Sequence, residues 1–286
     1  MKRTLKRILN LGAGVQSSTV LLMSCLGQLP KLDLAVFADT GWEPKAVYRH
    51  LWWLAEYAAD CGIPVHLVSA GNIKTDALTA QVRGVKTDGV RWASMPYHTR
   101  DRESGELGMI RRQCTSDYKI QPIERFIRQE VLDLAPRQRA PREAVVEQWF
   151  GISYDELYRM RRPSAKWTQF SYPLIDARMS RAGCMEWLES HGFPAAPRSA
   201  CIGCPFKSNY EWRRLRDESP DEWQDAIEFD QSIRNCGGMR GQVFLHRDCV
   251  PLGEADLRSK IERDAQGGQG ILFDGMRDEC QGMCGV

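Results

Sequence analysis

The sequence predicts an α/β fold with a Rossmann-like, doubly wound parallel sheet. Three short apolar runs, at residues 7–11, 34–37 and 63–68, have the length of buried strands. Two segments between them, 17–25 and 43–60, carry apolar residues at helical spacing. Strands that alternate with helices form parallel βαβ units, and such sheets bind ligands at the carboxyl ends of their strands.

The middle of the chain is less regular. Residues 81–108 lack a sustained period and contain glycines and charges, which predicts a long loop that could act as a lid. A helix is predicted at 121–132. Two short helices are predicted at 142–150 and 153–160, the second with Ser153 as its N-terminal cap.

A strand at 169–175 and a capped helix at 180–191 complete the predicted core. The fold class is therefore an α/β sheet with a small helical insertion and a cysteine-rich C-terminal extension. Four successive segments are expected: a nucleotide-binding core at 1–135, a helical insertion at 136–165, the completion of the core with a metal loop at 166–235, and a C-terminal extension at 236–286.

The composition is that of a globular protein. A chain of 286 residues, 43% of them hydrophobic, can bury one large core and an appendage. The net charge of +2 indicates no class of partner, but basic residues concentrate at 159–181 and 198–216. These stretches are either a solvated face or a surface for an anionic polymer, such as a nucleic acid, or for a phosphorylated substrate. No apolar window reaches membrane length, so we expect a cytoplasmic protein without a membrane partner.

The turn after the first predicted strand has the features of an anion site. A strand runs into small residues and then into a helix that opens with hydroxyl side chains. Glycine lets the backbone approach a phosphate, and the free amides and dipole of the helix hold the anion. The hydroxyls could add donors, although an ordinary tight turn has the same appearance. The residues are Leu11-Gly12-Ala13-Gly14-Val15-Gln16-Ser17-Ser18-Thr19.

Asp39 is placed at the end of the second predicted strand, before Thr40 and Gly41. A carboxylate there could accept a hydrogen bond from a ribose hydroxyl or an amino group. The alternative is that Asp39 caps the turn that follows it.

These segments resemble the PP-loop ATP pyrophosphatases, also called adenine-nucleotide α-hydrolases. Their loop, usually Ser-Gly-Gly-x-Asp-Ser, aligns with residues 13–18, where Ala13, Val15 and Ser17 depart from it. Further segments are similar to phosphoadenylyl-sulfate (PAPS) reductases, and in order they cover most of residues 8–206. They are Val36-Phe37-Ala38-Asp39-Thr40-Gly41, Arg111-Arg112-Gln113-Cys114-Thr115-Ser116-Asp117-Tyr118-Lys119-Ile120-Gln121-Pro122, Tyr172-Pro173-Leu174-Ile175-Asp176 and Cys201-Ile202-Gly203-Cys204-Pro205-Phe206.

The resemblance implies a site for ATP with Mg²⁺. Lys119 and Arg111 would offset phosphate charge. The residues expected to bind the nucleotide are Gly12, Ala13, Gly14, Val15, Gln16, Ser17, Ser18, Thr19, Asp39 and Thr40.

The cysteines predict a metal centre. Ten cysteines in a chain expected inside the cell favour metal ligation or thiol chemistry over disulfides. Cys201-x-x-Cys204 spans one tight turn, so the two thiolates can bind zinc or an iron–sulfur cluster, or can act in redox chemistry. The resemblance adds Cys114 as a third ligand. A 4Fe–4S cluster is the expectation, with zinc and uncomplexed thiols as alternatives.

The C-terminal cysteines have two interpretations. Cys280 follows Glu279, which looks slightly like the Glu-Cys-Gly ending of the sulfonucleotide reductases. Cys280 and Cys284 could carry sulfur as catalytic thiols, or Cys280 could be the fourth ligand of the cluster; Cys249 and Cys284 are further options, as is an open iron. Cys25 and Cys61 are expected to be inert packing residues.

The resulting hypothesis is ATP-dependent sulfur transfer. The enzyme would adenylate a nucleic-acid acceptor, release pyrophosphate and let sulfur replace the activated oxygen, as in DNA phosphorothioation or tRNA thiolation. A cysteine desulfurase or another sulfur donor would be its partner. One alternative is a PAPS reductase that produces sulfite, and another is a non-catalytic nucleotide-binding component of a defence or modification complex.

Overall fold

A computed structural model describes residues 5–83, 94–235, 241–258 and 262. Within these residues the contacts define two compact units. The first contains 5–70 and 115–200, and the second contains 71–114 and the described residues from 201 onward. Both units are thus assembled from separated stretches of the chain.

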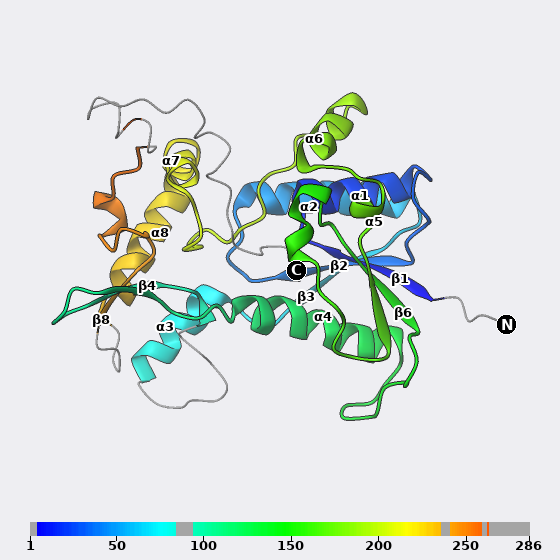
Figure 1. The fold of residues 1–286 in the computed structure, drawn as a ribbon, viewed down its shortest axis with the longest axis horizontal. Helices are drawn as coiled ribbons and strands as arrows, with labels where there is room; N and C mark the ends of the chain where they lie inside the picture. Colours follow the sequence, from blue (N-terminus) through cyan, green and yellow to red (C-terminus); the bar gives the residue numbers. More distant parts are fainter. Residues whose placement is uncertain (1–4, 84–93, 236–240, 259–261, 263–286) are drawn as a thin grey trace. The chain divides into compact units, whose positions relative to one another are not determined.

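The first unit is built on a five-stranded sheet in the order β3-β2-β1-β6-β7. All neighbouring strands are parallel, and Ile8 of β1 lies between Leu34 of β2 and Gln148 of β6. This is the predicted Rossmann-like α/β architecture (Figure 1). The strands are β1 (Lys6–Leu11), β2 (Leu34–Asp39), β3 (Val65–Ser69), β6 (Val146–Phe150) and β7 (Thr168–Ser171).

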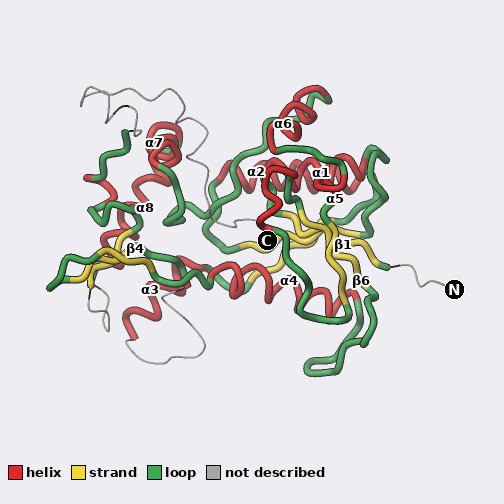
Figure 2. Tube along the Cα trace, viewed as in Figure 1, coloured by secondary structure: helices red, strands yellow, loops and turns green. Residues whose placement is uncertain are grey.

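Helices cover both faces of this sheet, as Figure 2 shows. On one face Leu9 and Phe37 pack against residues of α1, α2 and α6, and on the other Ile8 and Val36 pack against the helical segment around Ile123. Alternate residues of each strand therefore feed two separate cores, as a doubly wound sheet requires. The helices are α1 (Val15–Cys25), α2 (Lys45–Asp60), α4 (Gln121–Phe126) with π-helical turns η2 (Ser116–Ile120) and η3 (Ile127–Val131), α5 (Pro173–Asp176) and α6 (Arg181–Ser190).

The second unit combines a small antiparallel sheet with three helices. Its sheet has the order β5-β4-β8, and Trp212, Tyr97 and Phe229 are fully buried in its interior. Ser208 and Glu211 form a capping box at the start of α7. The elements are α3 (Ile73–Arg83), β4 (His98–Asp101), β5 (Leu107–Met109), α7 (Asn209–Glu218), α8 (Pro220–Ile233), β8 (Gly241–Phe244) and the 3₁₀ turn η5 (Leu252–Glu254).

Several predicted elements are confirmed and several are wrong. The predicted helix at 142–150 is wrong, because Val146–Phe150 is a strand inside the sheet. The predicted strand at 169–175 ends at Ser171 and gives way to α5. The loop predicted at 81–108 contains β4 and part of β5, and its residues 84–93 lie outside the described part of the chain.

The segment after β6 also differs from its prediction. Residues Tyr154–Arg159 form a 3₁₀ helix (η4), and the Ser153 side chain does not cap it. By contrast, Ser180 caps α6 as predicted, because its hydroxyl accepts a hydrogen bond from the Gly183 amide at 3.0 Å. Across the described residues, no helix combines the length and apolarity needed to cross a lipid bilayer.

Candidate functional site

A cavity of about 200 Å³ opens at the carboxyl ends of the strands in the first unit. This is the edge at which parallel α/β sheets bind their ligands. Four strands, the start of α4 and a segment after η4 contribute to its walls. The lining residues are Asn10, Leu11, Gly12, Phe37, Ala38, Lys119, Ile120, Ile123, Glu124, Gln148, Phe150, Arg161, Arg162, Ser164 and Phe170.

Two buried amides line the cavity together with the rings of Phe37, Phe150 and Phe170. Asn10 Nδ2 donates to Gln148 Oε1 at 3.3 Å and to the Trp149 carbonyl at 3.4 Å. Gln148 Nε2 in turn donates to Thr168 Oγ1 at 3.0 Å. The chain of bonds crosses β1, β6 and β7, so both amide groups are held in fixed orientations beside the aromatic rings.

Basic side chains stand at the rim. Lys119 Nζ lies 3.6 Å from Glu43 Oε1, and its side chain is 15% exposed. Arg161 and Arg162 are exposed. The Tyr172 hydroxyl accepts from the Arg161 amide at 2.9 Å and donates to its carbonyl at 2.7 Å, which fixes the backbone of this segment. Three basic side chains therefore line the cavity beside one acid, Glu124, and the Arg161 backbone is held in place.

The turn from β1 into α1 adjoins the cavity at Gly12. Ala13 is fully buried with a φ of 53°, a left-handed conformation that alanine rarely adopts. Gly14 is the N-cap of α1, and no side chain caps the helix there. The first amides of α1 therefore keep their hydrogen-bonding capacity, and together with the helix dipole they favour an anion.

The hydroxyls of this turn are engaged inside the protein. Ser17 Oγ accepts from the Gly12 amide at 3.1 Å and donates to the Gly14 carbonyl at 3.3 Å. The hydroxyl of Thr19, fully buried, donates to the Val15 carbonyl at 2.9 Å. These contacts stabilise the turn itself, which leaves its backbone as the main source of donors for a ligand.

Ser18 is likewise turned inward. Its fully buried hydroxyl is hydrogen-bonded to His50 Nε2 at 2.9 Å. Burial lowers the pKa of His50 from 6.5 to about 4, so the imidazole is neutral at pH 7. The assignment of Ser17, Ser18 and Thr19 to a nucleotide stays a prediction, because their hydroxyls are engaged inside the protein and the Ser18 amide donates to the Gly14 carbonyl at 3.0 Å.

Two residues that were not predicted flank the turn. A Cβ on Gly151, just after β6, would lie 2.6 Å from the Ser17 amide nitrogen, so only glycine allows this close approach. On the other side, Ser199 Cβ lies 3.4 Å from the position of a Cβ on Gly14. The Ser199 hydroxyl is buried and has no hydrogen-bond partner in the described structure. In the sequence Gly151 falls between the helices predicted at 142–150 and 153–160, so nothing there indicated a close approach to α1. Ser199 had no sequence signal either.

The turn is also connected to the arginine segment. Gln16 Nε2 donates to Glu156 Oε2 at 3.1 Å, and Arg159 donates to the same oxygen at 2.6 Å. Glu156 therefore links the first turn of α1 to η4, which immediately precedes Arg161 and Arg162. We had not predicted this role for Glu156.

Asp39 and Thr40 shape the turn that follows β2. Asp39 Oδ1 accepts from the Gly41 amide at 2.8 Å and from the Tyr48 hydroxyl at 2.7 Å. Burial, followed by this bond to Asp39, raises the pKa of Tyr48. Thr40 Oγ1 donates to Glu43 at 3.2 Å. The turn-capping alternative is thus observed, and a contact with ribose stays a prediction.

The predicted metal ligands that the structure describes all belong to the second unit. Cys201 and Cys204 lie on a tight turn, in which the Cys204 amide donates to the Cys201 carbonyl at 3.1 Å. Among the described residues, no three His, Cys, Asp or Glu side chains gather as a metal site. Cys280 and Cys284 lie outside these residues. The cluster, with Cys114 and Cys280 as ligands, stays a prediction.

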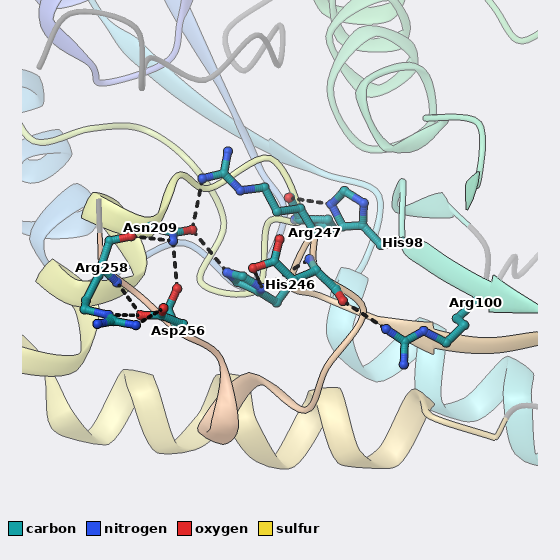
Figure 3. Close-up of polar contacts among 9 residues, drawn as sticks. His98, Arg100, Asn209, His246, Arg247, Asp256 and Arg258 are labelled. Carbon is teal, nitrogen blue, oxygen red and sulfur yellow. Dashed lines mark hydrogen bonds and ion pairs between the residues drawn. The ribbon is translucent and has the colours of Figure 1, made fainter. Parts of the chain in front are cut away.

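A polar network lies in the same unit (Figure 3). Asn209 connects it: its Oδ1 contacts His246 Nε2 and Arg247 at 3.2 Å, and its Nδ2 donates to the Asp256 carbonyl at 2.8 Å. Cys249 is buried and its thiol donates to the Thr99 carbonyl at 3.5 Å. The catalytic candidate Arg111 is exposed in this unit, and its role at a phosphate stays a prediction.

Comparison with known proteins gives a fold-level result. No protein family model matches the chain. No curated protein matches it in sequence. Among solved structures, PAPS reductase from Candida auris, in a phosphate complex, matches with a TM-score of 0.38 and 11% identity over 68% of this chain and 76% of that one. The sheet order and its two covered faces define this chain as an α/β protein of the Rossmann-like class.

Proposed function

We propose that the first unit binds ATP and activates an acceptor for sulfur transfer. The observation that carries this proposal is the uncapped start of α1, which adjoins an aromatic cavity with a positive rim at the carboxyl edge of a parallel sheet. A helix N-terminus attracts phosphate, and a cavity of flat apolar rings with fixed amides suits a heteroaromatic base. The two features together favour a nucleotide over an isolated anion.

The individual residues have separable roles in this proposal. The base lies among Phe37, Phe150 and Phe170, with Asn10 and Gln148 as hydrogen-bonding groups. The phosphates meet the backbone at 13–16, where Ser199 donates its hydroxyl. That hydroxyl supports the proposal independently, because a buried polar group without a partner costs free energy unless a ligand satisfies it. Lys119, Arg161 and Arg162 offset the phosphate charge.

The proposed reaction has two displacements. An acceptor oxygen attacks the α-phosphorus of ATP, the bond to the β-phosphate oxygen breaks, and pyrophosphate leaves. Hydrosulfide then attacks the activated centre, and AMP leaves with the acceptor oxygen. If the nucleophile is instead a persulfide from a sulfur donor, the same displacement gives an acceptor–S–S–R adduct, and a second thiol breaks its S–S bond, leaving the thiolated acceptor and a disulfide with R. Adenylation makes this possible because AMP is a better leaving group than hydroxide or an oxide. The acceptor is a nucleic acid, which the basic rim of the cavity favours.

Calorimetry with ATP and a pyrophosphate-release assay test this proposal. We expect ATP to bind, and pyrophosphate to appear only when tRNA or DNA is present. Nucleic-acid binding should weaken steeply with salt, and Arg161→Ala with Arg162→Ala should reduce it. Failure to bind ATP would overturn the proposal. Sulfite production from PAPS and reduced thioredoxin would indicate a reductase, and ATP binding without turnover on any acceptor would indicate a non-catalytic component.

The metal centre is a separate proposal. A cluster held by Cys114, Cys201 and Cys204 would supply or hold sulfur, and Cys280 or Cys284 would act as ligand or carrier. The tight turn between Cys201 and Cys204 and the presence of Cys114 in the same unit support this proposal. Iron and sulfide analysis of anaerobically purified protein tests it.

A further inference from the structure

A short surface segment of the first unit exposes large apolar side chains. It consists of η4 and the residues that follow it, 154–162, here termed the tyrosine segment. Tyr158 is 75% exposed and Tyr154 is 46% exposed, and Leu157 and Met160 are also exposed. Single exposed apolar residues are ordinary, but four of them within residues 154–160 indicate a surface of interaction.

The tyrosine segment is held at both ends. At its start the Tyr154 amide donates to the Met179 carbonyl at 2.8 Å. At its end the Arg161 amide and carbonyl both bond the Tyr172 hydroxyl, at 2.9 and 2.7 Å. The Tyr172 ring stacks on Phe150, which lines the cavity, with 5.8 Å between the ring centroids. The exposed side chains therefore stand on a fixed backbone beside the cavity, and a preorganised surface loses less entropy when it binds a partner.

The charge of this part of the chain is positive. Residues 154–166 contain four basic and two acidic side chains, a net charge of +2 (4 − 2). Arg161 and Arg162 line the cavity, and Lys166 is exposed. The two arginines follow Tyr158 by three and four positions, and a chain spans at most about 3.6 Å per residue. Their Cα atoms thus lie within about 15 Å of that of Tyr158. An anionic partner complements this surface.

We propose that the tyrosine segment binds an unpaired strand of nucleic acid, with bases stacked on Tyr158 and Tyr154 and phosphates held by Arg161 and Arg162. Every base has a flat face that an aromatic ring can stack on, and the backbone between bases carries the negative charge. A duplex covers those faces with neighbouring base pairs, so exposed tyrosines favour the single strand. The inference rests on the proposed function, because it states the form in which the acceptor reaches the cavity.

A second exposed tyrosine provides a matched control. Tyr210, in the first turn of α7 in the second unit, is 56% exposed. Arginines follow it as well, but they form ion pairs with acids: Arg213 with Glu262 at 3.0 Å, and Arg214 with Glu218 at 2.7 Å. These carboxylates weaken the attraction of phosphate to that helix. Tyr210 therefore tests whether any exposed tyrosine beside arginines is sufficient.

Fluorescence anisotropy with the full-length protein tests the inference. The probes are RNA and DNA strands of one sequence, each about 12 nucleotides long, and the duplex of each. We expect wild type to bind a strand more tightly than its duplex, and the better of the two strands identifies the acceptor as RNA or DNA. Tyr158→Ala should weaken strand binding roughly 5- to 150-fold, the value of one stacked base. Tyr158→Phe keeps the ring and should stay within about twofold of wild type. Tyr210→Ala should bind as wild type does.

A salt titration separates stacking from charge. Arg162→Ala should reduce the slope of log affinity against log salt by about 0.7, the value of one phosphate contact on a single strand. Tyr158→Ala should lower the affinity at every salt concentration and leave the slope unchanged, because a stacked ring releases no counterions. A slope that changes equally in both variants would contradict stacking at Tyr158.

Photo-crosslinking requires no variant. A strand containing 5-iodouracil, irradiated with the wild-type protein, should become linked to the peptide that contains Tyr154 or Tyr158. The inference is wrong if the strand links only to peptides of the second unit, if duplex and strand bind equally, or if Tyr158→Ala binds as wild type does. ATP binding without strand binding also overturns it and would leave the apolar side chains as a protein interface. Strand binding without ATP binding overturns the proposed function alone.

Discussion

Replacing Gly151 by alanine should displace the anion-binding turn. The added Cβ would lie 2.6 Å from the Ser17 nitrogen, 2.7 Å from Ser17 Cα and 2.9 Å from the Gln16 carbonyl carbon. All three are backbone atoms, so no side chain can rotate away and the start of α1 must move. Overpacking of this kind costs about 1–3 kcal/mol. A smaller opposing gain of about 0.4–1 kcal/mol comes from the reduced freedom of the unfolded chain.

Gly14→Ala provides the matched comparison on the other side of the turn. The nearest atom to a Cβ there is Ser199 Cβ at 3.4 Å, an ordinary contact, so this variant should keep wild-type stability. Its methyl group would nevertheless occupy the N-cap of α1, where a phosphate would approach the backbone. Gly151→Ala should therefore lower both the thermal midpoint and ATP affinity, whereas Gly14→Ala should lower ATP affinity alone.

Differential scanning fluorimetry and calorimetry with ATP separate these outcomes. A Gly151→Ala variant with an unchanged thermal midpoint would refute the close approach of β6 to α1. A stable Gly14→Ala variant with wild-type ATP affinity would refute phosphate binding at the turn, while leaving the packing argument intact.

Three further predictions follow from single contacts. Ser199→Ala should weaken ATP binding about tenfold, the value of a lost bond to a charged group, with no loss of stability, as calorimetry and thermal melts would establish. The pKa of His50 is lowered to about 4, so the unfolded chain takes up its proton first and stability should fall between pH 6.5 and 4. Urea melts of His50→Gln should show a shallower fall, and a slope equal to wild type would exclude His50. Changing each of the predicted metal ligands Cys114, Cys201 and Cys204 to serine should lower the iron content of anaerobically purified protein, as measured by elemental analysis. A variant that keeps the wild-type iron content would exclude that cysteine as a ligand.

The first three strands and two helices were predictable because their signals are local. Each strand is a short apolar run bounded by turn residues, and each helix has its own period. The strand β6 was missed because it lies inside the sheet between β1 and β7. Its Val146, Trp149 and Phe150 are buried on both faces, so the alternation that marks a half-exposed strand is absent.

The site was predictable only where one stretch of chain forms it. The glycine-containing turn and Lys119 were found from their own segments. Ser199 meets Gly14 only because the chain returns to the same sheet edge after β7 and α6, and no local pattern encodes that return.

Ser17 occupies the position at which the PP-loop motif has aspartate, and its contacts indicate whether this difference affects phosphate binding. If the side chain at this position bound the ligand directly, replacing aspartate by serine would remove that contact. Here the Ser17 hydroxyl bonds the Gly12 amide and the Gly14 carbonyl, so its work is to fix the shape of the turn. A phosphate bound at this turn would then be held by backbone amides, which do not depend on a carboxylate at position 17. The missing carboxylate bears on magnesium, for which carboxylate oxygens are preferred ligands, and not on the attraction of phosphate. The exchange of aspartate for serine is therefore compatible with phosphate binding at this turn.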